Sequence, residues 1–446
     1  MSTKYFPKDF LWGAATASYQ IEGSPLADGA GSSIWHRFSH TPGNILNGDT
    51  GDVAADHYRR YKEDIALMKE MGLKGYRFSI AWPRIYPYGK GKINVKGMDF
   101  YDRLVDELLE AGITPFITLY HWDLPATLQD LGGWANRDIA CWFADYADYM
   151  FQRLGDRVEN WSTLNEPWVV AFVGHLFGEH APGMKDIYSA FLVTHNQLRA
   201  HSKAVRAFRE ANIANGKIGI TLSNTSHDPA TDSMEDKIAA KVAHEWNNYP
   251  LFLHPIYYGD YPDTVKEFLK EYLPKNYYKD MEEIKEEIDF VGINYYSGDL
   301  VKFDPDSPLG GKSVKRGLPK TEMGWEIYPE GFYKILKGLQ DEYNPKEVYV
   351  TENGAAFDDK VENGEVHDHK RIDYLKKHFE MAHKAIEDGV KLKGYFVWSL
   401  LDNFEWAFGY SKRFGIVYVD YNTQKRIIKD SGKWYSQIIK NNSLDF

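Results

Sequence analysis

The chain has 446 residues, of which 43% are apolar and 26% charged, and its formal net charge at neutral pH is −11. Nucleic acids and anionic membranes are bound by clustered Lys and Arg, so this balance argues against polyanionic partners. The single cysteine, Cys141, excludes intramolecular disulfides and cysteine-based metal clusters. No run approaches the roughly 20 apolar residues of a membrane span. The N-terminal segment lacks the pattern of a secretory signal, which indicates a cytoplasmic protein.

Short apolar, β-branched or aromatic runs alternate along the chain with longer stretches of helical periodicity. This alternation is typical of βα units that build a parallel sheet. In chain order, strands are expected near residues 10–15, 76–80, 115–120, 160–164, 218–222, 290–294, 348–351 and 395–399.

Helices are expected between these strands. The segment 98–112 places Met98, Tyr101, Leu104, Val105, Leu108 and Leu109 on one stripe and ends at a glycine. Cys141 is expected as a small apolar residue on another helix. Two long loops are also expected, residues 297–320 and residues 402–428, the second with a small hairpin. Further helices are expected at 139–154, 186–210, 329–343, 370–388 and 430–441.

Eight strands with following helices predict an α/β protein, a single (β/α)8 barrel that forms one catalytic domain over residues 1–446. The average βα unit is about 55 residues long, whereas a minimal barrel of about 250 residues needs about 31. The excess is therefore expected in long βα loops at the C-terminal face of the barrel. No repeat or linker divides the chain.

An active site is expected among the residues just past the C-terminal strand ends, because active sites of such barrels lie there. Carboxylates, amides, an imidazole and indoles are expected to converge on this rim. In chain order they are Gln20, Glu22, Arg77, His121, Trp122, Asp123, Asn165, Glu166, Asn294, Tyr295, Tyr296, Glu352, Asn353, Trp398, Asp402, Glu405 and Trp406.

Two of these carboxylates, Glu166 in TLNEP and Glu352 in VTENG, follow the fourth and seventh strands. These strands lie across an eight-stranded barrel, so the two side chains can face one substrate. Glycoside hydrolysis uses two carboxyls about 5–5.5 Å apart when one attacks the sugar, or about 6.5–9.5 Å apart when water does. At 5.5 Å two charges repel by about 3 kcal/mol at an effective dielectric near 20, so one carboxyl is expected to keep its proton.

The residues of this rim also fit other interpretations. Glu166 and Glu352 could be salt-bridge partners or helix N-terminal acids. A metal centre lacks an HExxH signature, and His121 stands beside the bulky Trp122. A lyase or aldolase would need a lysine or a ligand cluster at a strand end, and a sugar-binding protein without turnover would not need both carboxylates. No nucleotide-binding glycine motif follows a strand, so no metal or other cofactor is expected.

Seven blocks of the sequence resemble glycoside hydrolase family 1, in the order of that family: FLWGAATASYQIEG, YRFSIAWPRI, TLYHWDLP, TLNEPW, INYYSG, VTENG and WSLLDNFEWAFGYSKRFGIVYVD. The likeness covers essentially the whole chain and is greatest to β-glucosidases of thermophilic bacteria. It implies a TIM barrel with a retaining mechanism, in which Glu166 is the acid/base and Glu352 the nucleophile. Arg77, Asn294 and Tyr296 would assist them. Substrate would be held by Gln20, His121, Trp122, Asn165, Trp325, Trp398, Glu405 and Trp406.

The resemblance also bears on substrate and partners. It implies hydrolysis of terminal β-D-glucosyl residues, with galactosyl and fucosyl activity, in disaccharides, short oligosaccharides and aryl glycosides. Glu405 would repel a 6-phosphate, and a Glu rather than a Gln at position 166 favours O-glycosides over thioglucosides. Arg77 could instead only close the barrel, and Trp325 could only pack a loop. The turn 85–89 and Phe408 depart from the family pattern and are expected near the aglycone entrance.

Overall fold

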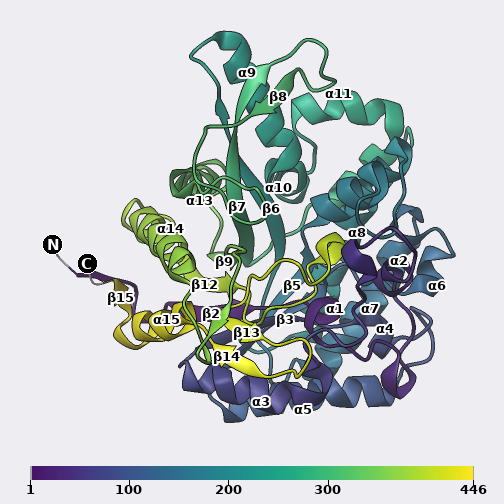
Figure 1. Ribbon diagram of the computed structural model, residues 1–446. Helices are drawn as coiled ribbons and strands as arrows, with labels where there is room; N and C mark the ends of the chain where they lie inside the picture. Colours follow the sequence, from purple (N-terminus) through teal and green to yellow (C-terminus); the bar gives the residue numbers. More distant parts are fainter. Residues whose placement is uncertain (1–2, 445–446) are drawn as a thin grey trace.

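The computed structural model describes residues 3–444, in which eight parallel strands form a closed barrel surrounded by helices (Figure 1). The strand order is β6-β5-β4-β3-β2-β12-β9-β7, and β7 also pairs with β6 to close the ring. The prediction of a (β/α)8 barrel is confirmed. Its strands are β2 (Leu11–Ala15), β3 (Gly75–Ser79), β4 (Thr114–Tyr120), β5 (Asn160–Asn165), β6 (Lys217–Pro229), β7 (Phe290–Phe303), β9 (Val348–Asn353) and β12 (Leu392–Trp398).

The barrel is filled by side chains. Phe116, Phe290, Tyr349 and Phe396, from β4, β7, β9 and β12, meet in its interior with ring centroids 5.1–5.4 Å apart. Small residues on neighbouring strands make room for these rings, since a Cβ added to Gly13 would lie 2.6 Å from the ring of Phe396. These packed rings fill the barrel interior below the polar strand ends and support them.

Helices cover the outside of the barrel, and those expected at 139–154, 329–343 and 430–441 have the expected bounds. In the helix of residues 95–110 the stripe from Met98 to Leu108 is buried, but Leu109 is 41% exposed. The prediction for Leu109 was wrong because each residue turns about 100°, which carries Leu109 past the buried side. The longer helices are α3 (His57–Glu70), α5 (Val95–Glu110), α7 (Ile139–Leu154), α8 (Ile187–Ala211), α9 (Met234–Asn247), α10 (Pro250–Tyr258), α11 (Asp263–Tyr272), α13 (Pro329–Tyr343), α14 (His369–Glu387) and α15 (Asp430–Asn441).

Shorter elements occupy the connections between strands and helices. Cys141 lies on α7 as predicted, although it is exposed rather than packed. Within residues 3–444 no helix combines the length and the apolar character that a bilayer crossing requires. The short elements are α1 (Ser18–Ile21), α2 (Ile34–Ser39), α4 (Trp82–Ile85), α6 (Ala126–Gln129), α12 (Met281–Ile284), the π-helix Val169–Phe177, and the strand pairs β10 (Val361–Glu362) with β11 (Glu365–Val366) and β13 (Val417–Val419) with β14 (Arg426–Ile428).

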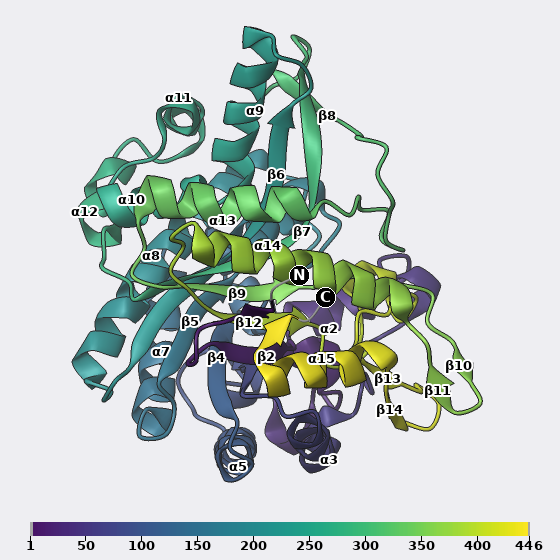
Figure 2. The same cartoon turned by 90° about the vertical axis from the view of Figure 1, so that its left-hand side faces the viewer.

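Two barrel strands continue beyond the rim. Past residue 225, β6 still pairs with β7 as far as Pro229 and Val301, and β7 then pairs antiparallel with β8 (Gly311–Val314). Together with α9 they project from one side of the barrel (Figures 1 and 2). The prediction of an irregular loop over 297–320 is therefore wrong for residues 297–303 and 311–314, which belong to β7 and β8 and pair as a ribbon. The hairpin expected within 402–428 is present as β13 and β14.

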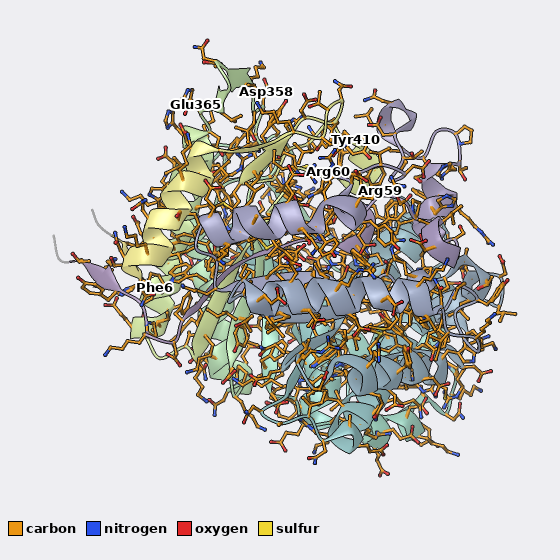
Figure 3. The ribbon with its side chains drawn as sticks, turned by 90° about the horizontal axis from the view of Figure 1, so that it is seen from below. Phe6, Arg59, Arg60, Asp358, Glu365 and Tyr410 are labelled. Atoms are coloured by element: carbon orange, nitrogen blue, oxygen red, sulfur yellow. The ribbon has the colours of Figure 1, made fainter. Side chains whose placement is uncertain are left out.

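The two ends of the described chain meet at the opposite end of the barrel. Strand β1 (Lys4–Tyr5) pairs antiparallel with β15 (Ser443–Leu444), and the indole of Trp12 donates to Asn442 at 2.9 Å. Phe6 lies beside these strands, away from the C-terminal face (Figure 3). The two chain ends therefore pack against each other and leave the strand ends of the C-terminal face free for a site.

Candidate active site

A pocket opens at the C-terminal ends of the barrel strands. Three predicted site residues, Gln20, Arg77 and Asn165, lie buried behind its wall. Each contacts a wall residue, Glu405 at 3.4 Å, Glu352 at 2.7 Å and His121 at 3.0 Å respectively. The structure thus brings all the predicted site residues together. Those that line the pocket are His121, Trp122, Glu166, Asn294, Tyr296, Trp325, Glu352, Trp398, Glu405 and Trp406.

Three pocket residues adopt a backbone conformation that side chains other than glycine rarely take. Trp122, Glu166 and Trp406 have φ values of 78°, 47° and 48°. Such conformations cost about 1–3 kcal/mol each and persist only where the surroundings enforce them. At Glu166 the backbone N–H is held by the carbonyl of Thr221 on the neighbouring strand, at 2.9 Å. The chain turns sharply at the end of β5, and this turn aims the Glu166 carboxyl into the pocket.

The carboxylate of Glu352 is held from both sides. Arg77 donates to its Oε1 and Tyr296 to its Oε2, each at 2.7 Å. A second nitrogen of Arg77 donates to Asn165 at 2.7 Å. Arg77 is fully buried, so its charge acts on Glu352 with little solvent screening. These two donors fix the orientation of Glu352 and favour its ionised form.

The carboxyl of Glu166 has a different environment. Its Oε1 accepts from the amide of Asn294 at 2.9 Å, and no cation pairs with it among the described residues. Burial and the nearby charge of Glu352 raise the pKa of Glu166 to about 8. Burial also raises the pKa of Glu352, but Arg77, Tyr296 and Asn294 oppose that shift. The proton that the pair shares at neutral pH therefore lies on Glu166.

A chain of hydrogen bonds connects the carboxyl pair to His121. Asn294 donates to Asn165 at 3.1 Å, and Asn165 donates to Nε2 of His121 at 3.0 Å. Burial lowers the pKa of His121 well below its usual value, so the ring is neutral. Because Nε2 accepts, the proton lies on Nδ1, which has no hydrogen-bond partner within residues 3–444. His121 therefore carries an unused donor.

Gln20 and Glu405 form a second polar group in the same wall. The amide nitrogen of Gln20 donates to Asn403 at 3.0 Å and to the carbonyl of Phe404 at 2.9 Å. The buried oxygen of the same side chain accepts from none of the residues that the structure describes. Burial and the charge of Glu352 raise the pKa of Glu405 to about 8. A ligand with several hydroxyls can satisfy these groups in either direction.

Indole rings make the apolar part of the pocket. The rings of Trp122 and Trp406 lie 4.5 Å apart, and that of Trp398 stacks on His121 at 5.9 Å. Trp325 is half-buried, lies 5.4 Å from the ring of Tyr296, and lines the pocket. Flat apolar faces beside polar edges suit a sugar ring.

Several rim residues predicted from the strand ends point elsewhere. Glu22 pairs with Arg84 at 2.6 Å, and Asp402 pairs with Lys429 at 2.7 Å. Asp123 accepts from Ser18, and Asn353 and Tyr295 also bond within the protein. Their positions at strand ends were predicted correctly, but partners elsewhere in the protein, such as Arg84 on α4 and Ser18 on α1, hold them away from the opening. Phe408 lines the pocket as expected, whereas no residue of the turn 85–89 does.

The strand-end rule missed residues that come from the long loops. One group follows Glu166 on the π-helix and just after it, and another lies on the projecting parts of β6 and β7. Only Trp168 had a local signal, since it stands two residues after Glu166. The missed lining residues include Trp168, Val173, Phe177, His180, Asn224, His227, Asp299 and Lys315.

Comparison with known proteins agrees with the geometry of this pocket. The profile of Glycosyl hydrolase family 1 matches residues 2–444. The chain belongs to this family. It is 69% identical to the 1,4-beta-D-glucan glucohydrolase of Thermotoga neapolitana over 99% of both chains, and 68% identical to Beta-glucosidase A of Thermotoga maritima over the whole of both. These matches confirm the resemblance to family 1 β-glucosidases of thermophilic bacteria, and with it the prediction of a glycoside hydrolase.

Solved structures give the same result. The Thermotoga maritima family 1 β-glucosidase superposes with a TM-score of 0.98 at 67% identity, over 99% of this chain and 100% of that one. A structure of the Thermotoga maritima family 1 glycoside hydrolase complexed with a cyclophellitol analogue has a TM-score of 0.99, also at 67% identity, and covers 100% of both chains. The fold of the whole described chain is therefore that of family 1.

Proposed function

We propose that this family 1 enzyme is a retaining, exo-acting β-glucosidase in which Glu352 is the nucleophile and Glu166 the acid/base. The asymmetry of the two carboxyls supports these roles. Glu352 accepts from Arg77 and Tyr296, which keep it ionised and oriented, whereas the proton lies on Glu166. A nucleophile must be ionised and a general acid protonated at the same pH, so the two environments match the two tasks.

The first step forms a glycosyl-enzyme. A carboxylate oxygen of Glu352 attacks the anomeric carbon, and the bond between the anomeric carbon and the leaving-group oxygen breaks. Glu166 gives its proton to that leaving-group oxygen. Oε1 of Glu166 accepts from Asn294, so the proton is on Oε2, which is free to meet the leaving group. The ester at Glu352 is neutral, and this change lowers the pKa of Glu166. Glu166 then takes a proton from water, whose oxygen attacks the anomeric carbon and releases Glu352.

The remaining predicted residues would hold the nonreducing sugar. The unpartnered Nδ1–H of His121 and the unpartnered oxygen of Gln20 would pair with hydroxyls, and Glu405 would accept from two more. Asn165 is oriented by Arg77 and Asn294 and would contact the 2-hydroxyl, where hydrogen bonds strengthen in the transition state. The indoles of Trp122, Trp325, Trp398 and Trp406 would supply the walls.

The substrate class follows from these contacts. Gln20 and Glu405 can accept either orientation of the 4-hydroxyl, so galactosides and fucosides would be cleaved along with glucosides. A 6-phosphate would bring its negative charge beside the carboxylate of Glu352 and the carboxyl group of Glu405, which disfavours phosphorylated sugars. Cellobiose-like disaccharides, short oligosaccharides and aryl glycosides are the expected substrates. We further propose that the enzyme is one catalytic domain, acts in the cytoplasm and needs no cofactor.

Product stereochemistry, two variants and a chelator test the proposal. NMR of the first product from p-nitrophenyl β-D-glucoside should show β-glucose before mutarotation, and α-glucose would contradict retention. Glu352→Ala should abolish turnover. Glu166→Ala should keep a rapid first step on aryl glucosides with good leaving groups and lose it on poor ones, whereas an equal loss for all leaving groups would contradict the acid role. Turnover that a chelator removes would instead indicate a metal mechanism.

A further inference from the structure

A cluster of potential metal ligands lies outside the pocket lining, between α2 and the loop that precedes α3. His36 and His40 are one turn apart at the C-terminal end of α2, and Asp52 faces them from the loop. Nε2 of His40 lies 3.1 Å from one oxygen of Asp52, and Nε2 of His36 lies 4.0 Å from the other. One ligand atom from each residue falls within 4.8 Å of the other two.

Hydrogen bonds to the other ring nitrogens orient both imidazoles. Nδ1 of His40 lies 2.7 Å from the carbonyl of His36, which can only accept, so this nitrogen carries a proton. Nδ1 of His36 lies 3.0 Å from the hydroxyl of Ser32, whose own proton goes to the carbonyl of Ser33. In neutral rings both Nε2 atoms therefore present a lone pair. Bonds of this kind to the distal nitrogen are what fix histidines as metal ligands.

The convergence of three electron-pair donors calls for a cation between them. Asp52 is an acceptor on both oxygens, and two lone pairs facing a carboxylate repel it unless something positive intervenes. Among the described residues neither Lys nor Arg pairs with Asp52. A proton on one ring can bridge one of the two gaps, whereas a metal ion bridges both.

We infer that His36, His40 and Asp52 form a binding site for a divalent transition metal, with Zn²⁺ as the preferred ion. Two imidazoles and one carboxylate suit Zn²⁺, Co²⁺ and Ni²⁺, and exclude Mg²⁺ and Ca²⁺, which prefer oxygen ligands alone. Ligand atoms of a Zn²⁺ centre lie about 3–3.5 Å apart. The ligand atoms here lie within 4.8 Å of one another, so the side chains have to close by at most about 1–2 Å. His40 and Asp52 are 40% and 47% exposed and can make this adjustment.

The site would act by tying two segments together. Helix α2 packs against the pocket through Trp35, whose ring lies 4.5 Å from that of Trp406. The loop before α3 contacts the segment that carries Trp406, because Asp49 accepts from the backbone N–H of Tyr410 at 3.0 Å. The hydroxyl of Tyr410 also accepts from the backbone N–H of Ala54 in this loop, at 3.1 Å. A metal ion bridging α2 and the loop would thus stabilise the native state without contacting the reacting atoms, and the inference does not depend on the proposed function.

The test uses the full-length enzyme without a histidine tag, after treatment with a chelator. Isothermal titration with ZnCl₂ should show one saturable site. Free Zn²⁺ at one hundred times its Kd should raise the Tm by about 3 °C, since a ligand that binds only the native state stabilises it. Co²⁺ should give the visible absorption of a protein-bound ion. Hydrolysis of p-nitrophenyl β-D-glucoside should be the same with and without chelator, which separates this site from the catalytic pocket.

Variants decide whether these three residues are the ligands. His40→Gln, His36→Ala and Asp52→Asn should each weaken Zn²⁺ binding at least tenfold and remove the Tm increase, with unchanged Tm in chelator. Ser32→Ala should weaken binding about 10- to 100-fold by freeing the His36 ring. His367→Ala is the matched control, because His367 is an exposed histidine 2.7 Å from a single carboxylate, Asp430, and its loss should change nothing. Absence of micromolar binding by the parent, or parental affinity in His40→Gln, would overturn the inference.

Discussion

The coupling between Glu166 and Glu352 can be measured directly. In the parent enzyme, burial and the charge of Glu352 raise the pKa of Glu166 to about 8. Replacing Glu352 by Gln removes that charge and keeps the burial. At a separation of about 5.5 Å and an effective dielectric near 20, the charge contributes about 3 kcal/mol, which is about two pKa units. The pKa of Glu166 should therefore fall to about 6 in Glu352→Gln.

The carboxyl carbons of ¹³C-labelled glutamate report this pKa by NMR, with Glu166→Gln to assign the resonance. Glu405→Gln is the matched control. Its charge is the weakest of the named influences on Glu166, so it should lower the pKa much less. The pH dependence of kcat/KM in the parent enzyme also reports these pKa values, because turnover needs a protonated acid and an ionised nucleophile. We expect kcat/KM to fall as the pH rises through about 8, and to fall in acid as Glu352 gains a proton. A pKa of Glu166 that stays near 8 in Glu352→Gln would refute the argument.

Three further substitutions test the parts that support the pair. Tyr296→Phe removes a donor at 2.7 Å from Glu352, which should lower kcat/KM about 10- to 100-fold and move the acidic limb of its pH profile to higher pH. Lys429→Met leaves buried Asp359 and Asp402 without the cation that they share. Denaturant titrations should therefore show a free energy of unfolding about 3–5 kcal/mol lower than that of the parent. Lys433→Met, at an exposed lysine, is the control and should change the free energy of unfolding little. Gly354→Ala would place a Cβ 1.6 Å from the carbonyl oxygen of Trp398, so thermal unfolding should show a loss of about 3 kcal/mol; an unchanged Tm would contradict this close contact.

The barrel was predictable because its strands are short, apolar and regularly spaced. All eight strands were predicted to start within a few residues of where they do start. A parallel strand is buried on both faces and therefore reads in the sequence as a short, nearly continuous apolar run. The continuations of β6 and β7 were missed for the opposite reason. Beyond the rim most of their residues are only partly buried, and glycine, proline and charge in this segment resemble a loop. Antiparallel pairing with β8, a contact with another segment, decides the conformation there.

The residues of the site that stand at strand ends could be predicted from the sequence. The rule located Glu166, Glu352 and Asn294, but it could not tell Glu405 from Asp402, which both follow the last strand. Asp402 is taken up by Arg413 and Lys429, whereas Glu405 has no cation partner among the described residues. Only the folded loops decide which carboxylate remains for a ligand. The left-handed backbone at Glu166 was likewise invisible, since nothing in TLNEP requires it.

The ribbon that β6 and β7 raise beyond the barrel separates two kinds of selectivity. Asn224, His227, Asp299 and Lys315 line the outer pocket from this ribbon, whereas the carboxyl pair stands on the barrel proper. Exchanging ribbon residues leaves the hydrogen bonds around Glu352 intact. New acceptor or leaving-group preferences could thus evolve, or be engineered, by altering the upper wall alone while the turnover chemistry beneath it is inherited unchanged.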